Sequence, residues 1–264
     1  MHVVSLGFKT DLMVRRLAGS VIEDRRDHLI VRTPHIPSFW WGNFVLLGRQ
    51  LRDGDTSWLL ETFRDSFPRS PHLAIGVDGM DGNAGSAAEL EQLRLEVVTS
   101  SVMMGNAFSL GNGADPTGIR PIATIEDWGR LEALREAWQG PAADDLERTF
   151  RRQRLAEAFE LARYRAGVWF GSFVGEELVA ALGIVSDGEG IARYQDVETH
   201  PDHRRQGHAR RLLQAAAGHA RTHYATKQVV IVADPEYHAI DLYRSLGFSE
   251  IERQVQLQGR TAPM

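Results

Sequence analysis

The chain has 264 residues, of which 43% are hydrophobic and 25% charged, and its formal net charge is −5. This composition is typical of a globular protein, and the length suffices for two domains of ordinary size. The negative charge argues against a general nucleic-acid-binding protein, because such proteins are normally basic. The sequence has no cysteine, which excludes disulfides, thiolate metal sites and a cysteine nucleophile.

The sequence also gives no sign of membrane insertion or export. Its apolar runs stay well short of the roughly 18 residues that a membrane span needs. The N-terminus lacks the pattern of a signal peptide. We therefore expect a cytoplasmic protein with neither a membrane nor a nucleic acid as its partner.

The first part of the chain predicts the element order β-β-β-α-β-α-β. Its strands and helices are expected in alternating apolar segments, separated by polar or glycine-rich turns. Asp55 is expected to cap the first helix, which carries Leu59 and Phe63 on its apolar face. The expected segments are 20–33 (a hairpin), 39–47 (a strand), 55–67 (a helix), 72–77 (a strand), 86–93 (a helix) and 95–104 (a strand).

A segment rich in glycine, asparagine and proline divides the chain, and residues 107–117 are interpreted as a linker. The domains are therefore predicted as 1–106 and 118–264. The second domain predicts the order β-α-α-β-β-β-α-β-α-β, an α/β layered fold. Its expected segments are 119–122, 124–138, 144–164, 168–174, 178–185, 191–199, 209–220, 229–233, 239–246 and 248–257.

Two helices near the start of this second domain have clear patterns. Thr124 is expected to cap the first, which has Trp128, Leu131, Leu134 and Trp138 on one face. The second is expected to bury Leu146, Phe150, Phe159 and Ala162. Its charged residues predict a solvated face with ion pairs three or four positions apart. These charged residues are Glu147, Arg148, Arg151, Arg152, Arg154 and Glu157.

The most informative motif is R-x-x-G-x-A, residues 204–209, which follows the strand at 191–199. Gly207 lies where the loop turns into a helix, so backbone N–H groups converge at a helix N-terminus. Arg204, Arg205 and Arg210 add positive charge. The pattern predicts a site for a phosphate or pyrophosphate; the alternative is a charged loop without a ligand.

Three histidines, His200, His203 and His208, lie in the same loop. Zinc needs a defined ligand set, and neither a carboxylate nor a fourth ligand is evident nearby. We therefore expect solvated loop histidines and no metal.

Three features together resemble the GNAT N-acetyltransferase family. They are the R-x-x-G-x-A motif, the preceding strand end VETHPDHR (197–204) and the segment AIDLYRSLGF (239–248). The element order agrees with that family over residues 118–258. The resemblance implies the GNAT acyl-CoA N-acyltransferase fold, with a mixed, mostly antiparallel sheet.

The resemblance also implies a reaction, in which acetyl passes directly from acetyl-CoA to a primary amine, without a metal or a covalent enzyme intermediate. The acceptor would be a small molecule or a peptide, and a homodimer is left open. Tyr243 stands at the family's usual general-acid position and would protonate the departing thiolate. The backbone of Val197, Glu198 and Thr199 would bind the pantetheine arm like an added strand. The pyrophosphate would be held by Arg204, Arg205, Gln206, Gly207, His208, Ala209 and Arg210.

The sequence departs from the family pattern at two places. Glu236 stands where an asparagine is common, three residues before the alanine that begins the 239–246 helix. The strand VVIVA, residues 229–233, lacks the glutamate base of some relatives, so the general base is left unassigned.

Strand alternation predicts which side chains of the 191–199 strand share a face. Arg193, Gln195 and Val197 are expected on one face. The other face is expected to hold Tyr194, Asp196 and Glu198.

The first half is interpreted as a truncated, degenerate GNAT-like copy. A shift of 153 positions places Gly54 on Gly207 and Leu90 on Tyr243. The loop of this copy, LRDGDT (51–56), has Asp53 and Asp55 where a pyrophosphate needs positive charge or bare amides. We therefore expect a structural partner without chemistry of its own.

Trp40 and Trp41 are open to two interpretations, core packing or an aromatic wall facing the substrate. The function itself also leaves alternatives. The favoured prediction is an N-acetyltransferase. The others are a non-catalytic acyl-CoA-binding sensor or scaffold, and an interaction protein that binds no CoA.

Overall fold

The computed structural model describes residues 1–111 and 117–260, which fall into two compact units. The first unit contains residues 1–103, 232–237 and the segment from Glu250 onward. The second contains residues 104–231 and 238–249. The chain therefore enters the first unit at its start, returns briefly near residue 232 and comes back with its last strand.

The first unit has a sheet in the order β1-β2-β3-β4-β11-β5. β3 and β4 are parallel, whereas the registers of β1–β2, β2–β3 and β4–β11 are antiparallel. Its elements are α1 (Leu6–Leu17), β1 (Val21–Asp24), β2 (His28–Arg32), the 3-10 turn η1 (Trp40–Gly42), β3 (Phe44–Leu47), α2 (Asp55–Ser66), β4 (His72–Val77), α3 (Ala87–Leu93), β5 (Glu96–Asn106) and β11 (Ser249–Arg260).

Side-chain alternation along β3 explains why helices cover both faces of this sheet. Val45 and Leu47 pack with the apolar residues of α2, while Phe44 and Leu46 pack with Phe8 of α1. Apolar residues on both faces of a strand require cover on both sides.

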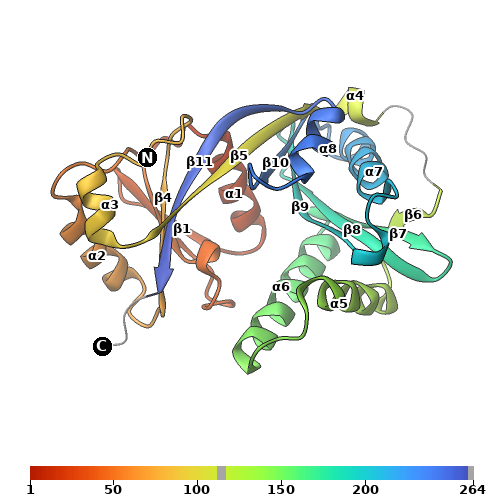
Figure 1. Ribbon diagram of the computed structural model, residues 1–264, viewed down its shortest axis with the longest axis horizontal. Helices are drawn as coiled ribbons and strands as arrows, with labels where there is room; N and C mark the ends of the chain where they lie inside the picture. Colours follow the sequence, from red (N-terminus) through yellow and green to blue (C-terminus); the bar gives the residue numbers. More distant parts are fainter. Residues whose placement is uncertain (112–116, 261–264) are drawn as a thin grey trace. The chain divides into compact units, whose positions relative to one another are not determined.

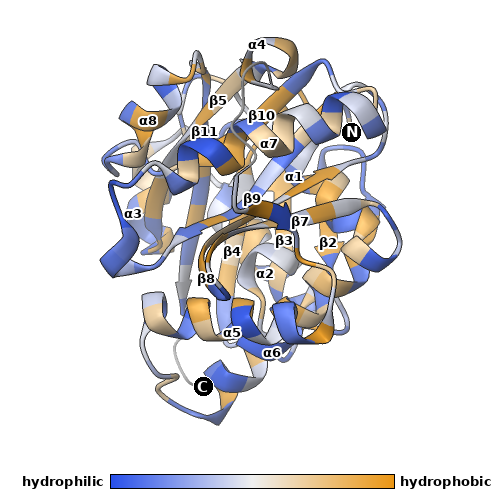
Figure 2. Cartoon of the chain, turned by 90° about the vertical axis from the view of Figure 1, so that its right-hand side faces the viewer, coloured by the Kyte–Doolittle hydropathy of each residue, from blue (hydrophilic) through white to orange (hydrophobic). Residues whose placement is uncertain are grey.

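The second unit has the strand order β10-β9-β8-β7-β6, in which β10 and β9 run parallel and the other registers are antiparallel. Figure 1 shows α7 on one face of β7, β8 and β9, with α5 and α6 on the other, and the turned view of Figure 2 agrees. Its elements are α4 (Ala107–Gly111), β6 (Ile119–Pro121), α5 (Ile125–Gln139), α6 (Asp145–Arg163), β7 (Gly167–Val174), β8 (Glu177–Ser186), β9 (Ile191–Thr199), the 3-10 turn η2 (Pro201–His203), α7 (His208–His223), β10 (Gln228–Ala233) and α8 (Ala239–Ser245).

The α/β class, the mixed and mostly antiparallel pairing and the element order of the second half are confirmed. Two helices, α1 and α4, were not predicted. α4 takes up the first residues of the predicted linker, whose residues 112–116 lie outside the described part of the chain. The predicted α2 cap is wrong, because Gly54 is the N-cap and Asp55 the first helical residue.

The predicted strand at 39–47 is wrong in its first half, which forms η1. Trp40 stacks on His72 with ring centroids 5.2 Å apart, and the Trp41 indole N–H donates to Gln258 Oε1 at 3.0 Å. Both rings also pack against the apolar cluster between α1 and the sheet. These contacts, all within the first unit, favour core packing over a substrate-facing wall.

The predicted face of α6 is also wrong. Leu146 is 62% exposed and Phe159 is 36% exposed, whereas Ala158 and Leu161 are buried. The C-terminal half of α6 therefore carries its contact with the sheet. Among the described residues, the structure has no helix of the length and apolar character needed to span a bilayer.

Candidate active site

β9 contains an irregularity that organises the site. Its register with β8 shifts between Ala181 and Gly183, and Asp196 adopts a φ of 47°. This is a β-bulge, in which an extra residue bends the strand and increases its local twist.

The bulge changes which helix the β9 side chains meet. Tyr194 Oη donates to the Leu213 carbonyl of α7 at 2.6 Å. Asp196 and Glu198 instead contact Arg135 of α5, on the opposite face of the sheet. The predicted alternation, with all three on one face, is wrong, because the extra residue shifts the period-two pattern by one position.

Beyond the bulge, the backbone edge of β9 that faces its parallel neighbour β10 has no β10 residues paired with it in the described part of the chain. The β10 register covers only Gln228–Val230 against Ile191–Arg193, while β8 pairs with Glu198 and Thr199 on the other side. In the described registers, residues 197–199 therefore lack a β10 partner. Such an edge suits an extended ligand that adds like a strand.

The loop after β9 has the geometry of an anion site. Arg205 has a φ of 61° and Gly207, the N-cap of α7, a φ of 84°, so left-handed residues alternate in a short turn. No side chain caps Gly207, and the first backbone bond of the helix is Arg211 N–H to the Gly207 carbonyl at 3.1 Å. The preceding N–H groups thus have no intrahelical acceptor, which fits an anion.

The charged side chains of this loop are exposed. Arg204, Arg205 and Gln206 all lie at the surface, and neither arginine forms an ion pair within the described residues. The Arg210 guanidinium donates to Ser245 Oγ of α8, which connects the start of α7 to the end of α8.

The prediction of a solvated His208 is wrong. Its side chain is 5% exposed and its Nδ1 lies 2.9 Å from Ser172 Oγ of β7. Burial and the nearby Arg211 charge lower the pKa of His208. The ring therefore anchors the first turn of α7 to the sheet. Among the described residues, no group of three or more histidine or acidic side chains is arranged for a metal ion.

Tyr243 lies on α8 and is 5% exposed. Its ring packs on Phe248 at a centroid distance of 6.0 Å, and Phe248 also meets Tyr194 of β9 at 6.2 Å. This aromatic cluster positions the α8 tyrosine relative to β9.

A cavity of about 860 Å³ lies within the second unit, between α5, α6 and the bulged part of β9. Its size is in the range of small-molecule sites. The lining includes Asp196 and Glu198 from β9, Trp138 from α5, and Phe150 and Leu155 from α6.

Glu198 is the side chain at this cavity with the most unusual electrostatics. It is 8% exposed, and Arg135 donates from Nε to its Oε2 at 3.2 Å and from Nη2 to Asp196 Oδ2 at 2.8 Å. Burial raises the pKa of Glu198 to about 7; the Arg135 charge opposes this rise and the Asp196 charge adds to it. A carboxyl with this pKa exchanges a proton near neutral pH.

The sequence motifs predict only a backbone contact for Glu198, and the 229–233 strand offers no base. The available signal was an acidic residue late on the strand that precedes the R-x-x-G-x-A loop. The bulge that turns its carboxylate toward the cavity leaves no comparable mark in the sequence.

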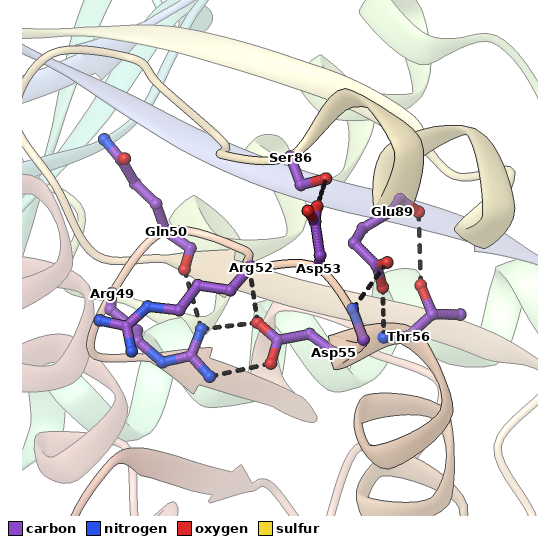
Figure 3. Close-up of polar contacts among 9 residues, drawn as sticks. Arg49, Gln50, Arg52, Asp53, Asp55, Thr56, Ser86 and Glu89 are labelled. Atoms are coloured by element: carbon purple, nitrogen blue, oxygen red, sulfur yellow. Dashed lines mark hydrogen bonds and ion pairs between the residues drawn. The ribbon is translucent and has the colours of Figure 1, made fainter.

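The corresponding loop of the first unit has the same turn, but there a carboxylate of the protein accepts hydrogen bonds from its N–H groups. Gly54 is the N-cap of α2 with a φ of 91°. The Glu89 carboxylate accepts from the N–H of Gly54 at 2.9 Å and from the N–H of Thr56 at 2.6 Å. Figure 3 shows the contact between Glu89 and Thr56. Asp55 is paired with Arg49 through both carboxylate oxygens. The anion position in this unit is thus filled by a carboxylate of the protein itself.

Comparisons with known proteins agree with this geometry. Residues 131–248 match the family model described as the Acetyltransferase (GNAT) family, and this segment is a GNAT domain. No curated protein matches the chain.

Solved structures share the fold over nearly the whole chain. A GCN5-related N-acetyltransferase from Kribbella flavida is 17% identical with a TM-score of 0.67, covering 98% of each chain. A functionally unknown conserved protein from Staphylococcus epidermidis ATCC 12228 is 14% identical with a TM-score of 0.70, covering 92% of this chain and 94% of that one. A tandem GNAT protein from the clavulanic acid biosynthesis pathway is 15% identical with a TM-score of 0.59, covering 95% of this chain and 88% of that one. A two-half architecture of this chain fits the fold of that tandem protein.

Proposed function

We propose that this protein is an acetyl-CoA-dependent N-acetyltransferase whose chemistry lies in its second unit. One observation carries the proposal. The bulged end of β9 has a loop fit for an anion after it and a buried carboxyl with a pKa of about 7 facing a cavity. A cosubstrate and an acceptor could thus meet along one strand.

The residues of β9 and its loop fit acetyl-CoA, which supplies an acetyl group activated as a thioester. The backbone edge of Val197, Glu198 and Thr199 would bind the pantetheine arm. N–H groups from Arg205 to Arg210 would hold the pyrophosphate, with Arg204 and Arg205 adding charge. The start of α7 supports this assignment, because the N–H groups that precede Arg211 have no intrahelical acceptor.

The acceptor amine must be neutral when it attacks the acetyl carbon. Glu198 takes the proton of the ammonium form, directly or through water. The amine nitrogen then forms a bond to the acetyl carbon as the carbon–sulfur bond breaks. Tyr243 donates a proton to the departing thiolate of CoA, and the resulting tyrosinate takes up, directly or through water, the second proton that the acylated nitrogen loses.

In our proposal the first unit is a structural partner and takes no part in the chemistry. Residues 1–106 and 118–264 would be two GNAT-like halves joined by 107–117, with β11 of the second half contributed to the sheet of the first unit. The first half has lost its cofactor site. The observation that supports this is the Glu89 carboxylate of α3, which accepts hydrogen bonds from N–H groups at the start of α2. α3 carries Leu90 at the position that Tyr243 has on α8.

The proposal is tested by measuring thiol release from acetyl-CoA with a panel of amines. Glu198→Gln and Tyr243→Phe are each expected to lower kcat by about 100-fold, as for the loss of a general base or acid. Both variants should retain CoA affinity, measured by calorimetry, because neither removes a pyrophosphate contact. Unchanged kcat in both variants would contradict the proposed roles. Tight CoA binding with no turnover of any amine would favour the sensor alternative.

A further inference from the structure

The charges that line the second unit's cavity indicate what kind of acceptor it takes. α5 and β9 contribute carboxylates to the lining, and α6 contributes most of the guanidinium groups. The acidic residues on the α5 and β9 side are Glu132, Glu136, Asp196 and Glu198, and the basic residues on α6 are Arg148, Arg151, Arg152 and Arg154.

Most of these charges are already paired within the protein. On the β9 side, Arg135 is shared between Asp196 and Glu198. On α6, Arg148 pairs with Asp145, Arg151 with Glu147 and Arg154 with Glu157. Arg151 also donates to the Gly140 carbonyl at 2.6 Å.

The charges that stay unpaired lie on two different helices. Within the described residues, Glu132 and Glu136 of α5 form no ion pair, and Arg152 of α6 forms neither an ion pair nor a hydrogen bond. A ligand that complements the lining therefore needs positive charge toward α5 and β9 and negative charge toward α6.

From this distribution we infer that the acceptor carries a carboxylate as well as the amine, as an amino acid or a short peptide does, and that Arg152 binds the carboxylate. The inference rests on the proposed acetyl transfer. The amine lies toward Glu198, where it loses its proton, and Trp138, Phe150 and Leu155 supply apolar surface for a side chain. A cavity of about 860 Å³ has room for more than one residue.

The test compares amines that differ only by the carboxylate. Steady-state thiol release is measured with L-phenylalanine against phenethylamine, L-lysine against cadaverine, and L-phenylalanylglycine as a peptide. The carboxylated members are expected to have a KM lower by about fivefold, the upper end of the effect of one exposed ion pair. Equal or better use of the decarboxylated amines, or spermidine as the best acceptor, would overturn the inference.

A matched pair of variants assigns the effect to Arg152. Arg152→Gln should raise KM for the carboxylated acceptors by about fivefold and leave phenethylamine unchanged. Arg163→Gln, on the same helix, is the control, because Arg163 pairs with Glu160 and is not among the cavity residues. An equal change in both variants, or none in Arg152→Gln, would count against the assignment.

Failure of the proposed chemistry would be visible separately. If no amine releases thiol, acetyl transfer is wrong, and calorimetry with L-phenylalanylglycine in the presence of CoA then tests recognition alone. Binding that Arg152→Gln weakens and Arg163→Gln does not would preserve the inference about the ligand. If L-phenylalanylglycine does not bind to the unmodified protein, the inference about the ligand is wrong.

Discussion

Glu198 owes its proposed role to three neighbouring influences that act on one carboxyl. Burial disfavours its ionised form, Arg135 favours it, and the adjacent Asp196 carboxylate disfavours it again. Because burial outweighs the Arg135 charge, which is shared with Asp196, the balance leaves a pKa of about 7 instead of an ordinary acidic value. A base with this pKa is ionised above neutral pH, yet basic enough to take a proton from an ammonium group.

The activity of the unmodified protein should therefore fall as pH falls through about 7, because protonated Glu198 cannot accept the ammonium proton. Replacing Arg135 removes the influence that lowers this pKa, so Arg135→Gln should move the acidic limb of kcat/KM to higher pH. Glu198→Gln should abolish that limb. The pH dependence of kcat/KM, measured from about pH 5 to about pH 9, tests both expectations.

Arg130→Gln is the control for this experiment. Arg130 lies on the same helix and pairs with Asp127, and it is absent from the cavity lining. Its profile should match that of the unmodified protein. A limb that stays in place in Arg135→Gln would mean that another group sets the pH dependence.

At the scale of elements, the same strand–loop–helix turn occurs in both units, but among the described residues a carboxylate of the protein binds its N–H groups only in the first. β3 leads to Gly54 and α2, and β9 leads to Gly207 and α7, and both glycines have a left-handed backbone. In the first unit, hydrogen bonds from Thr56 and Gly54 lower the pKa of Glu89, so its charged form is favoured. In the second, no side chain in the described part of the chain accepts a hydrogen bond from the N–H groups at the start of α7.

This contrast predicts that only one of two matched glycine variants affects the cofactor. Gly207→Glu should weaken CoA binding by at least about 100-fold, because it adds bulk and negative charge beside the pyrophosphate. Gly54→Glu should leave CoA affinity unchanged. A Cβ at either position would contact no neighbouring atom of the described residues, and both glutamates would have a similar left-handed backbone. The cost of that backbone strain is therefore similar in the two variants and does not account for a difference in CoA affinity.

Isothermal titration with CoA gives the affinity and the number of sites per chain. One site, lost in Gly207→Glu, is the expected result. Two sites, or a loss of affinity in Gly54→Glu alone, would show that the first unit has kept a cofactor site.

The elements of the second half could be predicted because each carries a strong local signal. Thr124 caps α5, Asp144 caps α6, and Gly207 and Gly247 have the positive φ that their motifs suggest. The R-x-x-G-x-A loop was likewise proposed from local sequence, whereas Tyr243 was implied by the resemblance of residues 239–248 to the GNAT family. These assignments needed no knowledge of distant contacts.

The parts that escaped prediction depend on tertiary contacts. Leu146 fits the apolar period of α6, yet only the end of that helix meets the sheet, so Leu146 stays exposed. The bulge at Asp196 comes from how β8 and β9 pair, and it alone decides that Glu198 faces the cavity. α1 has an N-cap in Ser5, but its start is fixed by residues far along the chain.

At the scale of the whole chain, the C-terminal strand is a structural part of the N-terminal unit. β11 lies between β4 and β5, and its residues Val255–Arg260 pair with β4 residues His72–Val77. Glu252 of β11 is 6% exposed and accepts hydrogen bonds from Ser5 Oγ and from the N–H of Leu6 and Gly7. The last strand thereby caps the first helix.

Glu252→Ala should therefore destabilise the first unit, although the mutation lies near the end of the chain. Loss of the cap leaves the α1 N–H groups without their acceptor and is expected to cost about 1–3 kcal/mol. Hydrogen exchange measured by mass spectrometry should show faster exchange in residues 5–10, and urea unfolding should report the lower stability. Glu250→Ala is the control, since the Glu250–Arg253 pair is within β11 itself. Equal exchange of α1 in both variants would mean that the C-terminal strand does not hold the first helix.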